Sequence, residues 1–366
     1  MAKRPSDGEH AEVSKKLKSD VTLPAGIGEF SSALTLESPE QRVFNNTACP
    51  LVLQCNKTES KIEAVAKWIS DNQTDLEQCL HTHGAVLFRG FPLNSAEDFD
   101  QFVKAFKGWE DLSYQDSLSF AVRTHLTGRV CTTNDGKNGG MVFHHEQAQT
   151  PKWPSKVFFY CQNPATSGGG TGVCPSDIVL QRLEEKFPQF VKDCEEKGVK
   201  YTAYLMPDPD PTKGVGRGWK SFFQRDTIQD VEARMKALNY TWEWMENDLL
   251  KCTSPRLEAV SVAPGTKKRV FFNQIVAQIA NAKEWSSRVG QENKEDKDID
   301  LDRFMTFGDG SSMPIDVLLE ARKISEAVAV EVMWQKSDVA LLDNHQVMHA
   351  RRLFEGPRKV YASLCD

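Results

Sequence analysis

The sequence lacks several features that would assign it to a simple class. It has no run of 18 or more apolar residues, the length that a membrane-spanning helix needs. Its first residues are polar and charged, unlike a secretory signal peptide. It has no basic excess either, because 45 lysines and arginines face 51 aspartates and glutamates, for a net charge of -6. We therefore expect neither a membrane protein nor a chain-wide surface for nucleic acid.

Cysteine motifs are also missing. Nine cysteines are scattered along the chain, and none is spaced as CxxC. This pattern supports neither a zinc knuckle nor a thioredoxin-like redox motif. We expect reduced thiols in an intracellular protein.

The composition indicates one folded domain behind a short tail. Residues 1–22 are charged and poor in large apolar side chains, so we expect them to be disordered. Forty per cent of the 366 residues are hydrophobic, enough for a sizeable core. We expect residues 23–366 to form a single domain.

Local patterns predict both helices and short strands. Residues 61–80 have helical periodicity and are followed by Gly84, and Ala85–Phe88 is typical of a buried strand. Ser95 and Asp98 resemble a capping box at the start of a helix. Strands are expected at residues 128–133, 141–149, 156–161, 268–273, 338–344 and 358–364, and helices at 176–187, 188–198, 225–239 and 313–330.

His144 and Glu146 are candidate metal ligands. They lie two residues apart in an expected strand, so both side chains should face the same way. A second histidine would complete a facial triad that leaves open positions for a co-substrate and dioxygen. His349 and His345 both follow the apolar strand of residues 339–342, and spacing alone does not separate them. His145 should face away from Glu146, and packing is its favoured role.

Two motifs carry a resemblance to a known family. Residues 143–149 (FHHEQAQ) look like the HxE segment of clavaminate synthase and its relatives, and residues 343–349 look like the DNxxxxH segment of the taurine dioxygenase (TauD/TfdA) family. In that pattern the ligand is five places after Asn344, which selects His349. The similarity runs from about Gly84 onwards and is closest to plant clavaminate synthase-like proteins. It implies an α+β fold with a double-stranded β-helix (jelly roll) core braced by helices and helical insertions.

The resemblance also implies Fe(II) as cofactor, with 2-oxoglutarate and O2 as co-substrates. Thr171, in a GGGT block, corresponds to the hydroxyl that binds the far carboxylate of 2-oxoglutarate. The basic partner of that carboxylate is Arg358 or Lys359. Alignment favours Lys359, whereas the bidentate guanidinium favours Arg358, which we prefer. Arg351 resembles the family's HxR segment and is expected to contact carboxylate or to support the site.

The implied function is a dioxygenase that oxidises an unactivated C–H bond of a small, acidic or amino-acid-like substrate and releases succinate and CO2. Hydroxylation, desaturation and ring closure are all open outcomes. Arg123, Arg217 and Lys220 are candidate substrate-binding cations, with ordinary ion pairs as the alternative. Two other functions stay open: a non-catalytic binding or regulatory protein on the same fold, and a metal-dependent jelly-roll enzyme that does not use 2-oxoglutarate.

The charged tail predicts a further partner. Lys3-Arg4, ten intervening residues and Lys15-Lys16-Leu17-Lys18 match the layout of a bipartite nuclear import signal. Residues 3–18 are thus a candidate site for an import receptor, and a cytoplasmic or a nuclear location is compatible with the chain. The sequence leaves the oligomeric state open.

Overall fold

The computed structural model describes residues 22–112, 117–121, 123–133, 140–208, 217–288 and 295–366. The tail predicted over residues 1–22 lies almost wholly outside this part. The largest element is an eight-stranded mixed sheet, the major sheet. Its spatial order is β1 (Ser31–Leu34), β4 (Leu51–Cys55), β5 (Ala85–Arg89), β19 (Val339–Asp343), β9 (Lys156–Asn163), β22 (Lys359–Cys365), β7 (Val130–Thr132) and β6 (His125–Thr127).

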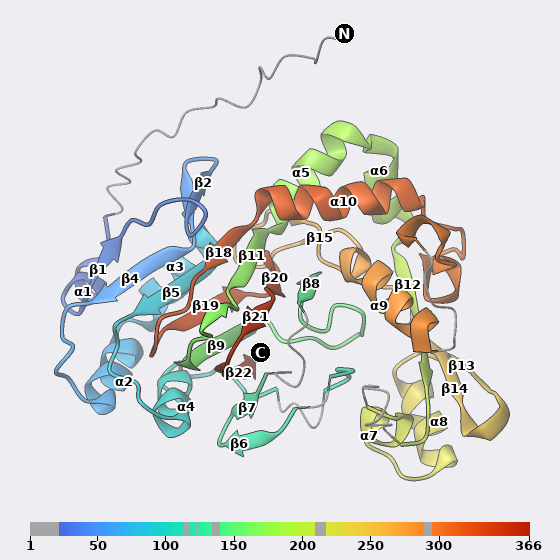
Figure 1. Cartoon of the computed structure of the whole chain (residues 1–366), viewed down its shortest axis with the longest axis horizontal. Coiled ribbons are helices and arrows are strands. Elements are labelled where there is room, and N and C mark those ends of the chain that lie inside the picture. The colour runs from blue at the N-terminus through green and yellow to red at the C-terminus, as the bar shows by residue number, and fades with distance from the viewer. Residues whose placement is uncertain (1–21, 113–116, 122, 134–139, 209–216, 289–294) are drawn as a thin grey trace, which may run out of the picture.

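A smaller antiparallel sheet, the minor sheet, packs against the major sheet (Figure 1). Its order is β18 (Val330–Val332), β11 (Thr171–Pro175), β20 (Val347–Arg351) and β8 (Met141–His144). Together the two sheets form the jelly-roll core, which confirms the predicted α+β fold class.

Alternation along the strands decides which side chains enter the space between the sheets. In β9, Phe159 belongs to the core between the sheets, whereas Phe158 packs on the opposite face. In β20, Val347 lies in the same inner core, and Met348 packs with the helices outside. Because strand side chains alternate, His349 faces inward like Val347.

Helices cover both outer faces (Figure 1). The major sheet is covered by α2 (Ile62–Asp71), α3 (Gln73–His83) and α4 (Ala96–Lys104). The minor sheet is covered by α5 (Ser176–Lys186), α6 (Pro188–Lys197), α9 (Ile275–Arg288) and α10 (Ile315–Val328). Burying one apolar face of each helix on a sheet gives the layered arrangement that stabilises such domains.

An insertion adds a third unit, with its own aromatic cluster around Phe222 and Phe223. It contains a sheet ordered β13 (Thr241–Trp244), β14 (Leu250–Thr253), β12 (Val199–Leu205) and β17 (Met305–Phe307), with α7 (Trp219–Phe223) and α8 (Ile228–Ala237). The remaining short elements are α1 (Ala25–Gly28), β2 (Arg42–Phe44), β3 (Thr47–Cys49), β10 (Ser167–Gly168), β15 (Ser261–Val262), β16 (Arg269–Val270), β21 (Phe354–Glu355) and three 3-10 turns, Glu246–Asp248, Asp296–Asp298 and Leu301–Arg303.

The strand predicted over residues 268–273 is reduced to β16, and two further element predictions were wrong in their extent. Residues 61–80 form two helices, because Asn72 leaves the helical conformation (φ -120°, ψ 17°) and its side chain donates to the Trp68 carbonyl at 2.9 Å, a competition with the helix ladder that Asn favours. The strand predicted over residues 141–149 ends at His144, and Glu146 lies in the turn that follows. Gly84, which follows the predicted helical segment, ends α3 in the left-handed conformation (φ 72°).

All nine cysteines are buried free thiols, in agreement with the expectation of reduced cysteines. Among the described residues, none of the helices is both long and apolar enough to span a bilayer.

Candidate metal centre

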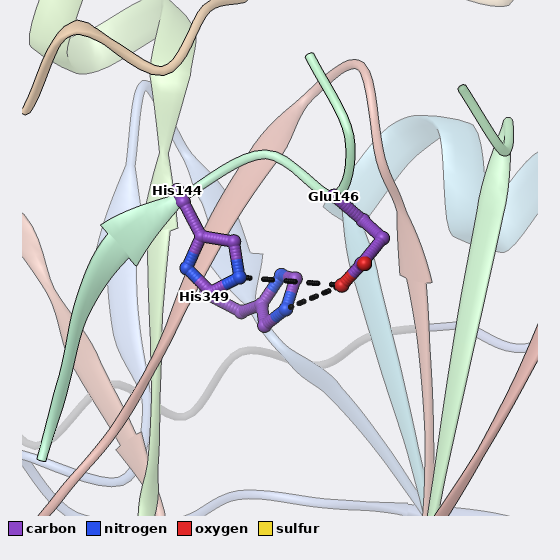
Figure 2. A group of neighbouring side chains, drawn as sticks. All are labelled: His144, Glu146 and His349. Carbon is purple, nitrogen blue, oxygen red and sulfur yellow. Dashed lines mark ion pairs between the residues drawn. The ribbon is translucent and has the colours of Figure 1, made fainter. Parts of the chain in front are cut away.

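The structure brings His144, Glu146 and His349 together, although they come from two distant segments (Figure 2). His144 is the last residue of β8, and its Cα partner across the antiparallel ladder is His349 in β20. The two imidazole centroids lie 4.3 Å apart. Glu146 reaches the same point from the turn, with its Oε2 atom 4.0 Å from His144 Nε2 and 3.7 Å from His349 Nε2.

The donor set and its electrostatics fit a divalent metal such as iron(II). One ligand atom from each of the three residues lies within 4.8 Å of the others. Burial, and then the charge of His349, lowers the pKa of His144 to about 4, so this imidazole is neutral near pH 7. Its Nδ1 faces the Val142 carbonyl at 2.9 Å, which makes Nδ1 the donor and leaves the Nε2 lone pair for a metal.

Glu146 is held ionised by neighbouring groups. Burial acts to raise its pKa, but the Arg123 guanidinium and the two imidazoles hold that pKa below its usual range. Arg123 Nη2 donates to both carboxylate oxygens of Glu146, at 3.3 and 3.2 Å. Two imidazoles and one carboxylate on one side of a point form the facial donor set that suits non-haem iron(II).

Asn344 fixes the turn that carries Glu146. Its Oδ1 accepts from the Glu146 backbone N–H at 2.8 Å, and its Nδ2 donates to the Glu146 carbonyl at 3.0 Å and to the Pro154 carbonyl at 2.7 Å. The side chain of Asn344 thus replaces a strand neighbour where β8 has ended. Sequence reasoning included Asn344 only as part of a motif and missed this role.

The other two histidines of these segments have separate structural roles. His145 is fully buried, and its ring nitrogens contact the Asn344 carbonyl (2.5 Å) and the Ser176 hydroxyl (2.8 Å). Burial is the main cause that lowers the pKa of His145 to about 3. His345 accepts from Trp153 Nε1 at 3.2 Å and stacks on Phe272. The packing predicted for His145 agrees with these contacts, and His345 is not part of the triad.

The residues expected to bind 2-oxoglutarate lie along the neighbouring strands. Thr171 in β11 is the Cα partner of Arg351 in β20, and both side chains are buried. The Arg351 and Arg358 guanidinium carbons lie 5.8 and 5.6 Å from the centroid of the Phe354 ring. Arg358 is 8% exposed and its Nε donates to the Gly169 carbonyl at 3.1 Å, whereas Lys359 is exposed.

Of the three cations considered for substrate binding, only Arg123 contacts the triad. Arg217 is buried and donates to the backbone carbonyls of Ser117 and Ser221. Lys220 pairs with Asp208 at 3.0 Å. Arg217 and Lys220 thus contact other parts of the protein, which agrees with the alternative that they are ordinary structural cations.

Gln147 is a residue that sequence reasoning missed. It follows Glu146, adopts a left-handed backbone conformation (φ 60°) and is 2% exposed. Neither Oε1 nor Nε2 of its side chain has a hydrogen-bond partner among the described residues. Unpaired buried polar groups and non-glycine residues with positive φ are both costly and concentrate at functional sites.

A jelly-roll core that carries a largely buried His-Glu-His triad is typical of non-haem iron(II) oxygenases. Residues 50–364 match the family model of the taurine catabolism dioxygenase TauD, TfdA family. The chain is 37% identical over 333 residues to a clavaminate synthase-like protein of Arabidopsis thaliana, covering 89% of this chain and 96% of that protein. It is 28% identical over 292 residues to the dapdiamide synthesis protein DdaC of Enterobacter agglomerans, covering 80% and 84% of the two chains.

Among solved structures, a putative alpha-ketoglutarate-dependent taurine dioxygenase from Burkholderia xenovorans superposes with a TM-score of 0.49 and 13% identity, over 92% of each chain. The family match and the Arabidopsis relative establish that the chain belongs to the TauD/TfdA family. It is therefore a 2-oxoglutarate-dependent dioxygenase that uses iron(II).

Proposed function

We propose that this enzyme oxidises an unactivated C–H bond of a small, amino-acid-like substrate, with His144, Glu146 and His349 as its iron ligands. The convergence of these three side chains is the observation that carries the proposal. Three protein ligands on one side leave the remaining positions for the co-substrate and dioxygen. When bound, iron(II) with 2-oxoglutarate and dioxygen supplies the oxidising power, and 2-oxoglutarate leaves as succinate and CO2.

The protein residues bind and orient the reactants. Thr171, Arg351 and Arg358 are suited to the far carboxylate of 2-oxoglutarate, because two buried guanidinium groups offer charge-assisted hydrogen bonds in a shielded site. Arg358 is the preferred anchor, since Lys359 is exposed to solvent. Arg123 keeps the carboxylate of Glu146 ionised and oriented toward the two imidazoles.

The side chain of Gln147 is suited to binding a polar substrate. A carboxamide that is buried without partners can donate to one substrate group and accept from another. An amino-acid-like molecule, with its ammonium and carboxylate groups, offers both. A purely apolar substrate would leave both amide atoms unsatisfied, at a cost of about 1–3 kcal/mol.

The test is succinate release by purified enzyme with iron(II), ascorbate and 2-oxoglutarate. A panel of amino acids and small acids is added one compound at a time, and oxidised product is sought by mass spectrometry. We expect slow succinate formation when no compound is added and faster formation when the substrate is present. A protein that binds iron but never forms succinate would contradict the proposal and favour a non-catalytic role.

A further inference from the structure

A tryptophan outside the metal centre donates a hydrogen bond to one hydroxyl group of the proposed co-substrate site. Trp334 follows β18, and its indole Nε1 lies 3.0 Å from Thr171 Oγ1. An indole N–H can only donate, so the Thr171 oxygen is the acceptor in this bond. The hydroxyl proton of Thr171 must therefore be directed elsewhere. Among the described residues, the Thr171 hydroxyl makes no hydrogen bond besides the one from Trp334.

The surroundings of Thr171 favour an anion as the missing acceptor. Its Cα partner Arg351 is buried, and the guanidinium groups of Arg351 and Arg358 lie on the same ring, that of Phe354. Arg358 is tied to the Gly169 carbonyl, two residues before Thr171. A carboxylate placed here would meet two cations and one hydroxyl donor.

The position of Trp334 is itself fixed by a buried ion pair. Arg89 Nη2 donates to Asp338 Oδ2 and to the Met333 carbonyl, both at 2.9 Å. Asp338 Oδ2 also accepts from the Gln335 backbone N–H at 2.9 Å. These bonds close the turn on both sides of Trp334, so its indole is held in place before any ligand arrives.

We propose that Trp334 is a positioning residue for 2-oxoglutarate, acting through Thr171. Its N–H occupies the acceptor side of the Thr171 oxygen and turns the hydroxyl proton toward the far carboxylate of the co-substrate. The hydroxyl then loses little freedom on binding, which favours affinity. A donor that already accepts a hydrogen bond is also polarised and donates more strongly. This inference rests on the proposed function, because it assumes that Thr171 contacts 2-oxoglutarate.

The test measures ligand affinity by calorimetry on the manganese(II)-loaded enzyme, so it does not depend on activity. Trp334→Phe keeps an aromatic ring and removes the N–H, Thr171→Val removes the hydroxyl, and the double variant combines the two changes. Trp68→Phe is the matched control, because the indole of Trp68 donates to the Gly26 carbonyl (3.0 Å) on the far side of the major sheet. The probes are 2-oxoglutarate and 2-oxobutyrate, a 2-oxo acid without the second carboxylate.

We expect Trp334→Phe to weaken 2-oxoglutarate binding about five- to tenfold, within the usual loss for one hydrogen bond between neutral groups. The affinity of Trp334→Phe for 2-oxobutyrate should change less than about twofold. Trp68→Phe should bind both probes as tightly as the unsubstituted enzyme does. In the Thr171→Val background, adding Trp334→Phe should have almost no further effect, since the hydroxyl it positions is gone.

Three results would overturn the inference: an unchanged affinity in Trp334→Phe, an equal loss for both probes, or additive losses in the double variant. Each of these leaves the proposed function intact if the unsubstituted enzyme binds 2-oxoglutarate. If the unsubstituted enzyme binds 2-oxobutyrate as tightly as 2-oxoglutarate, no second-carboxylate site exists. That result would overturn the proposed co-substrate site and, with it, the role of Trp334.

Discussion

Asn344 and Glu146 are joined by a reciprocal pair of hydrogen bonds, although they lie 198 residues apart in the sequence. The Asn344 carboxamide accepts from the Glu146 N–H and donates to the Glu146 carbonyl. The turn that presents the carboxylate is thus held by the segment that also carries His349. The positions of two proposed iron ligands are therefore coupled through one amide side chain.

We expect Asn344→Ala to weaken metal binding about 10- to 100-fold, the usual effect of losing support for a metal ligand. The free energy of unfolding should fall by about 2–4 kcal/mol, because buried backbone groups lose their partners. Metal titration and chemical denaturation measure the two effects. Asn281→Ala, at an exposed site, is the control and should change neither quantity. Normal metal affinity in Asn344→Ala would contradict the coupling.

The assignment of the distal ligand is tested by comparing His349→Ala with His345→Ala. His349→Ala should lose bound iron and all 2-oxoglutarate turnover, because only two protein ligands remain. His345→Ala should keep both and lose only part of its stability, about 1–2 kcal/mol from the contacts with Trp153 and Phe272. Iron content and the visible charge-transfer band with 2-oxoglutarate are the measurements. The reverse pattern would show that His345 is the ligand.

The anchor for the far carboxylate is tested by Arg358→Gln and Lys359→Gln. Losing a charge-assisted bond should cost about 1.5–3 kcal/mol, or about 10- to 150-fold in 2-oxoglutarate affinity. We expect this loss in Arg358→Gln only, because Lys359 is exposed. Titration of 2-oxoglutarate against each variant separates the two residues. If neither variant binds more weakly, neither residue is the anchor.

Replacing Gln147 should make the protein more stable and its response to the substrate weaker. Gln147→Met keeps the length of the side chain and removes two unsatisfied polar atoms, so the free energy of unfolding should rise by about 1 kcal/mol. Slow, substrate-free succinate formation should persist, while stimulation by the substrate is lost. Gln181→Met, at an exposed position, is the control for both the stability and the stimulation by substrate. If the variant is less stable and its succinate formation is still stimulated normally by the substrate, the amide has a structural role.

We propose nuclear import through residues 3–18. These residues should carry a large fluorescent cargo into the nucleus of eukaryotic cells, because acidic grooves of import receptors bind exposed basic clusters. Changing Lys15, Lys16 and Lys18 to Ala should leave the cargo in the cytoplasm. Changing the same three residues to Arg preserves the charge and should preserve import. Cytoplasmic cargo with the native segment, or equal import after the alanine changes, would exclude this role.

The sequence predicted those parts of the site that depend on local pattern. The HxE spacing indicated His144 and Glu146, whereas His349 was selected over His345 only by the resemblance to the DNxxxxH segment of the family. Local pattern did not reveal where β8 ends, because the hydrogen bonds that replace its ladder come from Asn344, 198 residues away. The same limit applies to the bond from Trp334 to Thr171, which spans 163 residues. Such pairings arise from sheet order, which no nearby residue encodes.

Helix and strand positions were predicted where apolar periodicity was strong, as for β5 and α5. The prediction failed at Asn72, where one polar side chain bonds a helix carbonyl and divides the expected helix. Arg358 is buried on the same face as Val360 and Ala362, whereas Lys359 is exposed. Strand alternation therefore selects Arg358 once the inward position of Val360 is known, and the sequence alone did not fix that position.

The central position of β9 has a consequence for how the protein is made. Its two neighbours in the major sheet, β19 and β22, lie within residues 339–365, so β9 leaves the ribosome before either of its partners has been synthesised. Until then an eight-residue, largely apolar strand has unpaired edges, which are prone to aggregation and call for chaperone protection. His349 is made in the same late stretch. A prematurely terminated chain would therefore be unable both to close its sheet and to gather three iron ligands, so the capacity for oxidation arises only with the finished fold.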